Sequence, residues 1–271
     1  MNVPRSLLFV PGARPDMVAK VPRWSPDAVA VDLEDAVAAD DKEAARDVAV
    51  RAVADLPADA GTAVFIRVNG STTPWYADDV AAVAGSAAHG VVLPKLESVD
   101  QVEDVSRRIG DRVVIGGLET ARGVAGCREL LAAGGLLAVY FGAEDYIASL
   151  GGRRTAAGLE VLHARSEVVL AAALAGCGAL DQTVVAVHDA EAFRTDAATG
   201  RDLGYDGKIC IHPSQVALAH EAFTPTDDEV AHARAVIDAG TFGVGVLDGE
   251  MVDDVHLRMA RAVLARAGLG S

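Results

Sequence analysis

The chain has few of the residues that mark several common classes of protein. Its 271 residues include only three cysteines, Cys127, Cys177 and Cys210, and no CxxC pair. An odd number of widely spaced cysteines argues against a disulfide framework or a structural zinc site, and favours a reducing cytoplasm. No apolar run approaches the ~20 residues that span a bilayer. The first run, Leu7–Val10, is followed at once by a Pro-Gly pair and is too short for a signal peptide. We therefore expect a cytoplasmic protein with no membrane partner.

Positive charge is also scarce. Lys and Arg number 24 against 39 Asp and Glu, for a formal net charge of −15, which disfavours nucleic acid as a partner. An anionic ligand would need a locally basic pocket or a metal ion, and Arg14, Arg67 and Lys95 are candidates for such a pocket. The sequence also lacks GxGxxG after its first strand, a Walker P-loop, GxSxG and HExxH. The absence of these motifs argues against an oxidoreductase, a kinase, a serine hydrolase or a zinc peptidase.

What the sequence does contain is a series of short apolar runs that are followed by polar residues. The predicted strands are Leu7–Val10, Ala28–Val31, Val64–Val68, Val91–Leu93, Val113–Ile115, Leu137–Phe141, Val184–Val187 and Ile209–Ile211. The polar residues that follow strands are Asp32-Leu33-Glu34-Asp35, Arg67 with Asn69, Lys95, Glu119, Glu144-Asp145, His188 and His212. Helix-like segments separate the runs. This arrangement is typical of the α/β class and of a (β/α)8 TIM barrel, in which the loops after the strands carry the chemistry.

Helix boundaries are visible as well. Ser98-x-x-Gln101 and Thr226-x-x-Glu229 fit capping boxes, and Leu159–Ala175 is the longest apolar helical pattern. Gly178 stands where that helix should stop.

The barrel accounts for residues 1–223 and leaves 224–271 as a C-terminal helical arm or lid. Within this arm we predict a helix at Asp228–Ala239, a Gly-rich turn at Gly240–Gly249 and a last helix at Val255–Ala267. A closed barrel does not need these residues. They are candidates for a lid or an oligomerisation arm.

Glu119 and Asp145 follow predicted strands that are neighbours in the barrel. Two carboxylates a few ångströms apart repel, and one takes up a proton unless a cation lies between them. Mg²⁺ suits such a pair, because it prefers oxygen ligands and keeps several waters that substrate oxygens can displace. We therefore predict a Mg²⁺ site at Glu119 and Asp145. The alternative is that each pairs with a nearby arginine, such as Arg122 or Arg153.

Arg67 ends the third predicted strand, next to the acidic group Asp32, Glu34 and Asp35 on the adjacent strand. A guanidinium binds a carboxylate through two parallel hydrogen bonds, which lysine cannot do, so Arg67 is a candidate to bind a substrate carboxylate. The alternative is an ion pair with the acidic group, and the two roles are compatible. Strand alternation sends Asp32 and Glu34 to one face and Asp35 to the other.

We expect part of this acidic group to be structural. The partners expected for it are Arg67, Lys42 and Arg46. Lys95 is either an electrostatic partner of the substrate or a salt bridge to the acidic group, and a Schiff-base role is redundant where a metal is used. His188 and His212 are weaker candidates, because an isolated His at a strand end is more often structural.

Several motifs together carry a resemblance to a known family. They are Arg5-Ser6-Leu7-Leu8-Phe9-Val10-Pro11-Gly12, Val31-Asp32-Leu33-Glu34-Asp35, Arg67-Val68-Asn69, Leu93-Pro94-Lys95, Leu118-Glu119-Thr120-Ala121-Arg122-Gly123, Phe141-Gly142-Ala143-Glu144-Asp145, Ile211-His212-Pro213 and Gly249-Glu250-Met251-Val252-Asp253. In this order and spacing they resemble the citrate lyase beta-subunit-like family. This is a branch of the HpcH/HpaI aldolase superfamily that includes malyl-CoA and citramalyl-CoA lyases.

The resemblance implies a (β/α)8 barrel, Mg²⁺ and substrate at Glu119, Mg²⁺ at Asp145 and a substrate-binding Arg67. It also implies that Asp253 is a catalytic acid/base. In such enzymes the C-terminal segment packs across a neighbouring subunit of a homotrimer, so Asp253 would serve the adjacent active site. The residues alone favour a different role for Asp253, as the N-cap of the last helix. Arg14 and Lys95 are the residues that we expect to bind coenzyme A.

The predicted function is Mg²⁺-dependent cleavage or formation of a carbon–carbon bond in a 3-hydroxyacyl-CoA of the malyl-, citramalyl- or citryl-CoA type. The products are acetyl-CoA and a 2-oxo acid, and water in the closed site makes thioesterase activity a second outcome. One alternative is a metal-dependent aldolase that acts on free 2-oxo-3-hydroxy acids. Another is a subunit of a citrate lyase-like complex, which would use a carrier-protein thioester.

Overall fold

The computed structural model describes residues 1–57, 61–240 and 244–269. The chain forms two compact units, Met1–His220 and Glu221–Ser271, and the boundary between them falls within helix α10 (Ser214–Phe223).

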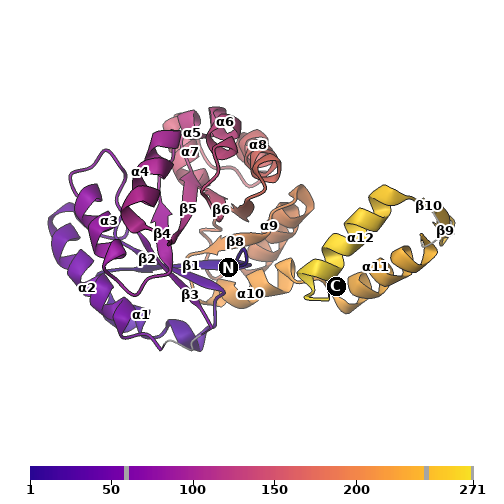
Figure 1. The fold of residues 1–271 in the computed structure, drawn as a ribbon, viewed down its shortest axis with the longest axis horizontal. Coiled ribbons are helices and arrows are strands. Elements are labelled where there is room, and N and C mark those ends of the chain that lie inside the picture. The colour runs from indigo at the N-terminus through magenta and orange to yellow at the C-terminus, as the bar shows by residue number, and fades with distance from the viewer. Residues whose placement is uncertain (58–60, 241–243, 270–271) are drawn as a thin grey trace. The chain divides into compact units, whose positions relative to one another are not determined.

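The first unit is a closed barrel of eight parallel strands, each hydrogen bonded to the next, with β8 pairing back to β1 (Figure 1). The strands are β1 (Ser6–Pro11), β2 (Ala28–Asp32), β3 (Ala63–Arg67), β4 (Gly90–Leu93), β5 (Val113–Leu118), β6 (Ala138–Phe141), β7 (Gly178–Asp181) and β8 (Gly207–Cys210). The predicted TIM barrel is confirmed. Because all eight strands run in the same direction, their carboxyl ends open on one face, and the loops that follow them share that face.

The seventh strand was predicted at the wrong place. Residues 184–187 lie in the loop after β7, and Val185 there is 57% exposed. The true strand has no long apolar run, and it ends in a buried aspartate, Asp181. That carboxylate is tolerated because it accepts hydrogen bonds from Arg165, at 2.6 and 2.8 Å, and from Lys208, at 2.7 Å. Gly178 is accordingly the first residue of β7 and not a helix stop.

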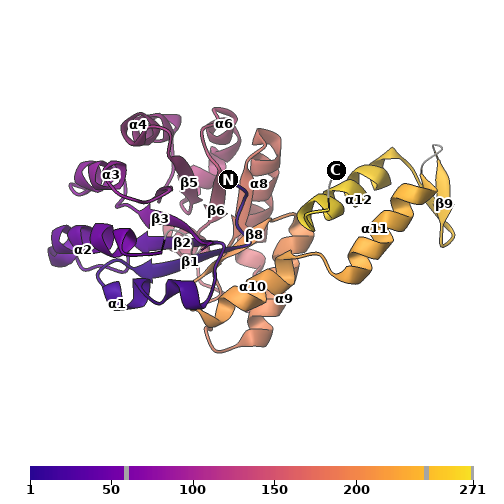
Figure 2. The same ribbon diagram turned by 60° about the horizontal axis from the view of Figure 1, so that its bottom comes forward.

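Helices surround the barrel on its outside (Figure 2). They are α1 (Pro15–Val18), α2 (Lys42–Ala54), α3 (Tyr76–Ala84), α4 (Val99–Ile109), α5 (Ala121–Ala125), α6 (Cys127–Ala132), α7 (Ala143–Ser149), α8 (Leu159–Ala175), α9 (Ala190–Leu203) and α10. Short 3-10 turns occur at Val21–Arg23 and Ala39–Asp41. The predicted bounds of α8 are confirmed. So is the capping box of α4, in which the Ser98 N–H donates to Gln101 Oε1 at 2.9 Å.

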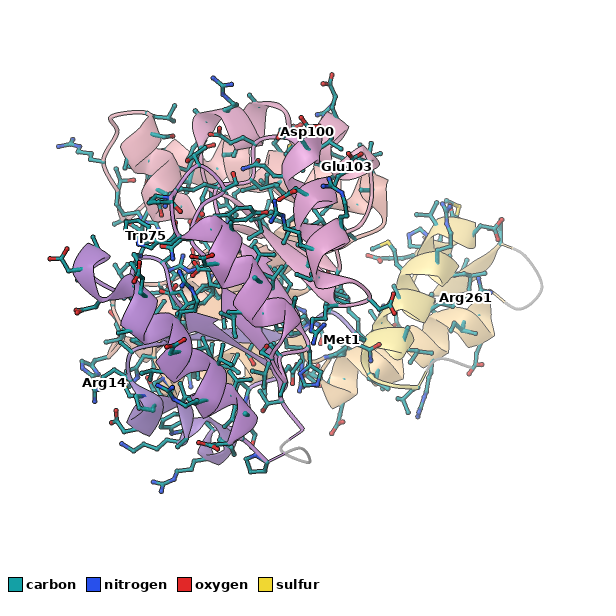
Figure 3. The ribbon with its side chains drawn as sticks, turned by 60° about the vertical axis from the view of Figure 1, so that its left-hand side comes forward. Met1, Arg14, Trp75, Asp100, Glu103 and Arg261 are labelled. Atoms are coloured by element: carbon teal, nitrogen blue, oxygen red, sulfur yellow. The ribbon has the colours of Figure 1, made fainter. Side chains whose placement is uncertain are left out.

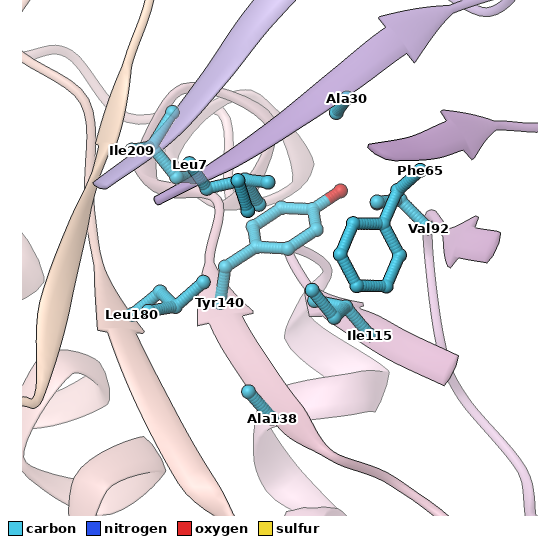
Figure 4. Packing of buried hydrophobic residues seen from close by; sticks show 10 residues of the cluster. Leu7, Ala30, Phe65, Val92, Ile115, Ala138, Tyr140, Leu180 and Ile209 are labelled. Carbon is cyan, nitrogen blue, oxygen red and sulfur yellow. The ribbon is translucent and has the colours of Figure 1, made fainter. Parts of the chain in front are cut away.

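The barrel interior is filled by side chains that point inward from all eight strands. Its buried core consists of Leu7, Ala28, Ala30, Phe65, Val92, Ile115, Ala138, Tyr140, Leu180 and Ile209 (Figure 4). This packing closes the interior to solvent, as in other TIM barrels. A ligand can therefore reach only the residues at the two ends of the strands.

The second unit consists of α11 (Asp227–Ala239), α12 (Asp254–Arg266) and a hairpin of β9 (Gly245–Leu247) and β10 (Glu250–Val252). Both helices lie within one residue of their predicted bounds, and the capping box at Thr226 is confirmed. The predicted Gly-rich turn is only partly a turn, because β9 pairs antiparallel with β10. Residues 241–243 of that prediction lie outside the described residues. The unit has its own small core: Ala233, Val236, Val252, Leu257 and Ala260.

All three cysteines are free, and Cys127 and Cys210 are buried. Among the described residues, no helix has both the length and the apolar character needed to cross a bilayer.

Candidate active site

The mouth of the barrel is organised around a buried arginine. Arg67, at the end of β3, donates from Nε and Nη2 to the two carboxylate oxygens of Asp32, at 2.7 Å each. The register of the barrel explains the pairing, because Asp32 of β2 lies directly opposite Arg67. The ion pair predicted as an alternative therefore exists. It occupies the edge of the guanidinium that suits a bidentate carboxylate best.

The rest of the acidic group also contacts Arg67. Glu34 Oε2 lies 2.9 Å and Asp35 Oδ2 lies 3.5 Å from Arg67 Nη1. The prediction that Asp35 faces away was wrong, because β2 ends at Asp32 and the alternation of a strand does not continue into the following turn. In the described part of the chain, the expected partners Lys42 and Arg46 do not bind these carboxylates. Lys42 donates instead to the carbonyl oxygens of Leu33 and Glu34, and Arg46 pairs with Asp79.

Lys95 joins the acidic group to the predicted metal ligands. Its ammonium lies 2.5 Å from Glu34 Oε1 and 4.0 Å from Asp145 Oδ1. Its backbone has a φ of +50°, which is uncommon for a residue other than glycine. In this conformation its N–H donates to Glu119 Oε1 at 2.7 Å. Burial alone would lower the pKa of Lys95, but the hydrogen bond to Glu34 raises it overall. The side chain is therefore a cation at neutral pH, as an electrostatic role requires.

Glu119 follows β5 and is 2% exposed. No salt bridge joins it to a cationic side chain in the described part of the chain, so pairing with Arg122 is not observed. Arg122 lies instead 3.9 Å from Glu97. Burial raises the pKa of the Glu119 carboxyl to about 7, and the nearby carboxylates of Glu34 and Asp145 add to the rise. The nearby Arg67 charge opposes this rise only in part, so Glu119 is a buried carboxyl with no salt bridge to a cationic side chain among the described residues.

Asp145 lies close to Glu119 because β5 and β6 are neighbours. The sequence predicted Asp145 at the end of a strand, but it lies in the first turn of α7. Its side chain is 41% exposed. Arg67, Glu119 and Asp145 all line one cavity of about 420 Å³ at the carboxyl ends of the strands. Asp32 and Asp35 of the acidic group line the same cavity.

The donor set fits a hard divalent cation. In the described part of the chain no three His, Cys, Asp or Glu side chains are grouped to hold a metal, which argues against a closed protein cage. Two carboxylates beside an open cavity suit Mg²⁺, which keeps waters or substrate oxygens in its other positions. Because burial and neighbouring carboxylates raise the pKa of Glu119, a positive charge beside it would be stabilising.

Arg14, His188 and His212 do not line this cavity. Arg14 is on the outer surface (Figure 3), where it forms hydrogen bonds of 2.8 and 3.0 Å to Asp16. The rings of His188 and His212 meet edge to face with centroids 5.7 Å apart, and His212 Nδ1 lies 2.7 Å from Ser214 Oγ. These contacts connect the loops after β7 and β8, which agrees with a structural role for both histidines.

Asp253 belongs to the second unit and caps α12. Its carboxylate accepts hydrogen bonds from the N–H groups of Val255, at 2.9 Å, and His256, at 3.3 Å. The His256 ring Nδ1 also lies 2.7 Å from Asp253 Oδ1, and this contact lowers the pKa of Asp253. The capping role is therefore present, and the catalytic role of Asp253 stays a prediction.

Three residues of the cavity were missed at the level of sequence. Phe9 and Tyr140 line it, and the Phe9 ring also packs 4.9 Å from the Arg67 guanidinium carbon. Gly142 lies against Glu119, where a β-carbon would overlap the carboxylate. The available signal was alternation: Phe9 and Tyr140 point inward on strands that the apolar pattern had already located.

Comparison with known proteins agrees with this geometry. Residues 5–213 match the family described as HpcH/HpaI aldolase/citrate lyase. A citrate lyase subunit beta-like protein of Deinococcus radiodurans is 48% identical over 282 residues, which cover 98% of this chain and 99% of the relative. A (3S)-malyl-CoA thioesterase of Cereibacter sphaeroides is 36% identical, with 97% and 94% covered.

Solved structures are similar over most of the chain. CitE from Mycobacterium tuberculosis, in complex with magnesium, acetoacetate and coenzyme A, superposes with a TM-score of 0.84 at 38% identity, covering 97% of this chain and 98% of that one. The citrate lyase beta subunit of the same organism, complexed with oxaloacetate and magnesium, gives 0.72 at 38% identity, with 82% and 97% covered. The family match over most of the chain, and relatives aligned over nearly its full length, lead to one conclusion: the chain belongs to the HpcH/HpaI aldolase/citrate lyase family.

Proposed function

We propose that the protein is a Mg²⁺-dependent carbon–carbon lyase acting on a 3-hydroxyacyl-CoA of the malyl-, citramalyl- or citryl-CoA type. The observation that carries this proposal is the single cavity lined by Glu119, Asp145 and Arg67, two carboxylates and a guanidinium at the mouth of a barrel. Relatives named for malyl-CoA and citrate, and a similar structure with magnesium and coenzyme A, support it.

Glu119 and Asp145 are the residues that would hold Mg²⁺. When bound, the ion would polarise the oxygens of the acid half of the substrate. Arg67, whose Nη1 is not used by Asp32, stabilises negative charge where it develops, on the enolate oxygen or the substrate carboxylate. Lys95 adds a second positive charge beside these carboxylates. We also propose that Lys95 and Arg14 contact coenzyme A.

In the cleavage direction the bond between the hydroxyl-bearing carbon and the acetyl methylene breaks. The hydroxyl gives its proton to water in the site and becomes the carbonyl of the 2-oxo acid, and the bonding electron pair passes to the thioester as an enolate. A carboxyl group that has taken up a proton from water then protonates the enolate carbon to give acetyl-CoA, so no net proton is gained or lost. In this proposal the proton donor is Asp253 of the partner subunit in a homotrimer. General acid catalysis of this kind typically raises the rate roughly 10²- to 10⁴-fold.

The test is incubation of the purified chain with Mg²⁺ and a small panel of acyl-CoAs, followed by mass spectrometry of the products. Acetyl-CoA with a 2-oxo acid identifies a lyase. Free coenzyme A with the intact hydroxy acid identifies a thioesterase. Cleavage of free 2-oxo-3-hydroxy acids, with no reaction of any thioester, would replace this proposal by a simple aldolase. Activity only with a carrier-protein thioester would identify a subunit of a citrate lyase-like complex.

A further inference from the structure

Tyr140 is a buried polar residue at the centre of the barrel. It lies on β6, directly opposite Gly117 of β5, and is 2% exposed. Its ring packs edge to face against Phe9, with centroids 6.0 Å apart. Figure 4 shows the ring in the middle of the barrel core, with the hydroxyl pointing away from β6 across the interior. Tyr140 also lines the cavity that contains Glu119 and Arg67.

The hydroxyl of Tyr140 is fully buried and has no hydrogen-bond partner within the described part of the chain. Such groups are rare, because burying a hydroxyl without a partner is unfavourable. Tyr205 shows how a buried tyrosine hydroxyl is normally accommodated. That phenol is equally buried, but it donates to the carbonyl oxygen of Arg165 at 2.7 Å.

The group best suited to accept from Tyr140 is the Glu119 carboxyl. The Glu119 carboxyl lies close enough to the phenol to interact with it electrostatically. A phenol has an ordinary pKa of about 10, so it keeps its proton at neutral pH and is a donor. Arg67 is also close, but a guanidinium has no acceptor. Glu119 Oε1 accepts from the Lys95 N–H, which leaves the second carboxylate oxygen as the one to accept from the phenol.

Two glycines make room for these groups. A β-carbon on Gly117 would overlap the Tyr140 hydroxyl oxygen, and one on Gly142 would overlap the Glu119 carboxylate. Gly117 lies in β5 opposite Tyr140 of β6, and Gly142, just after β6, lies against Glu119, just after β5. This arrangement brings the phenol and the carboxyl together from adjacent strands.

We propose that Tyr140 is a positioning residue of the active site, whose hydroxyl donates a hydrogen bond to the Glu119 carboxylate and holds it in the orientation that binds the metal. The inference rests on the proposed function, in which Glu119 is a Mg²⁺ ligand. It adds a residue that acts through Glu119 and does not itself contact the metal.

The test compares Tyr140→Phe with the wild type, because phenylalanine keeps the ring and removes only the hydroxyl. Partners that orient metal ligands typically contribute 10- to 100-fold to metal affinity or activity. We therefore expect the Kd for Mg²⁺, measured by isothermal titration calorimetry, to rise about tenfold and kcat to fall by a similar factor. The KM for the thioester should stay within about twofold, since the phenol does not bind that half of the substrate.

Tyr205→Phe is the matched control. It removes an equally buried hydroxyl with an observed hydrogen bond, so it should lower the melting temperature and leave Mg²⁺ affinity and kcat unchanged. If folded Tyr140→Phe binds Mg²⁺ and turns over like the wild type, the phenol only fills space and the inference is wrong.

A crystal structure of the wild type supplies a readout that does not depend on the reaction. The inference requires Tyr140 Oη within about 3.0 Å of a Glu119 carboxylate oxygen, and a separation beyond about 3.5 Å overturns it. Failure of the proposed function looks different: the wild type would then neither bind Mg²⁺ nor cleave any thioester, and the crystallographic distance would still decide the contact between Tyr140 and Glu119.

Discussion

Asp32 binds the guanidinium of Arg67 through two parallel hydrogen bonds of 2.7 Å, and both side chains are buried. The edge of the guanidinium that could grip a substrate carboxylate in the same way is therefore already in use. Asp32 fixes the orientation of Arg67 and leaves Nη1 unused by that carboxylate, although Nη1 lies 2.9 Å from Glu34 Oε2 and 3.5 Å from Asp35 Oδ2. Arg67 can thus be both a structural ion pair and a substrate-binding residue.

Replacing Arg67 by lysine should lower kcat/KM by ~10²-fold or more, because one ammonium cannot reproduce the planar set of donors that serves Asp32 and a ligand together. Steady-state kinetics on the thioester substrate measure the change. Arg46→Lys is the control, since the Arg46 guanidinium binds Asp79 and not the acidic group of the mouth. Kinetics equal to the wild type in Arg67→Lys would mean that Arg67 is a structural ion pair alone.

Glu119→Gln and Asp145→Asn should each weaken Mg²⁺ binding and abolish turnover while the fold is kept, because each removes one anionic ligand of two. Calorimetric titration with Mg²⁺ and circular dichroism measure binding and fold separately. Glu167→Gln, which breaks only an ion pair with Arg128 on the outside of the barrel, should bind Mg²⁺ normally. Full activity of the EDTA-treated wild type would refute the metal requirement altogether.

The raised pKa of Glu119 predicts how stability depends on pH. Between the ordinary glutamate pKa of 4.5 and the folded value of about 7, the native state holds a proton that the unfolded state has released. The contribution of Glu119 to the stability of the metal-free protein should therefore be present at low pH and be lost as the pH rises through about 7.

Added Mg²⁺ competes with this proton, so the increase in melting temperature that it produces should be larger at about pH 8 than at about pH 6. Differential scanning calorimetry with and without Mg²⁺ at the two pH values measures it. Glu119→Gln cannot titrate and should not show the difference. An equal effect of Mg²⁺ at both pH values in the wild type would contradict the assignment of Glu119 as a ligand.

If active sites are shared between subunits, Asp253→Asn and Glu119→Gln should be inactive alone and recover activity when they are co-expressed. Asparagine is preferred over alanine here because it is also a good N-cap, so α12 is preserved while the acid/base group is removed. With random assembly roughly a quarter of the sites combine an intact Glu119 with an intact Asp253. Mixed oligomers that form, as shown by pull-down with two tags, but stay inactive would place Asp253 in its own active site or outside the chemistry.

The parts of the fold that follow regular patterns were predictable from sequence. Apolar runs located seven of the eight strands and capping boxes located α4 and α11, since both signals depend on neighbouring residues. The seventh strand escaped because its buried Asp181 is stabilised by Arg165 and Lys208. These residues are distant in sequence, and no local pattern indicates that they meet.

In the active site, too, the contacts that follow from strand order were predictable, and those that depend on tertiary structure were not. The order of strands places Glu119 beside Asp145 and Arg67 beside Asp32 once a barrel is assumed. The left-handed backbone of Lys95, which brings its N–H to Glu119, has no sequence signature because it depends on the tertiary contact itself. Tyr140 could not be predicted for a related reason: a tyrosine within an apolar strand resembles a core residue, and only the structure shows that its hydroxyl has no hydrogen-bond partner among the described residues.

The close approach of Tyr140 to Gly117 also constrains how this sequence can diverge. A β-carbon at position 117 is compatible with the observed backbone only if the side chain at position 140 becomes shorter, because the two would otherwise occupy the same space. A substitution of Gly117 therefore requires a shorter side chain at position 140, 23 residues away in the adjacent strand, whereas position 140 can change while Gly117 is kept. An alanine at 117 and a small residue at 140 would restore the packing but would remove the phenol from the carboxylate. In a descendant of this enzyme, any side chain at position 117 would therefore be accompanied by a smaller residue at position 140.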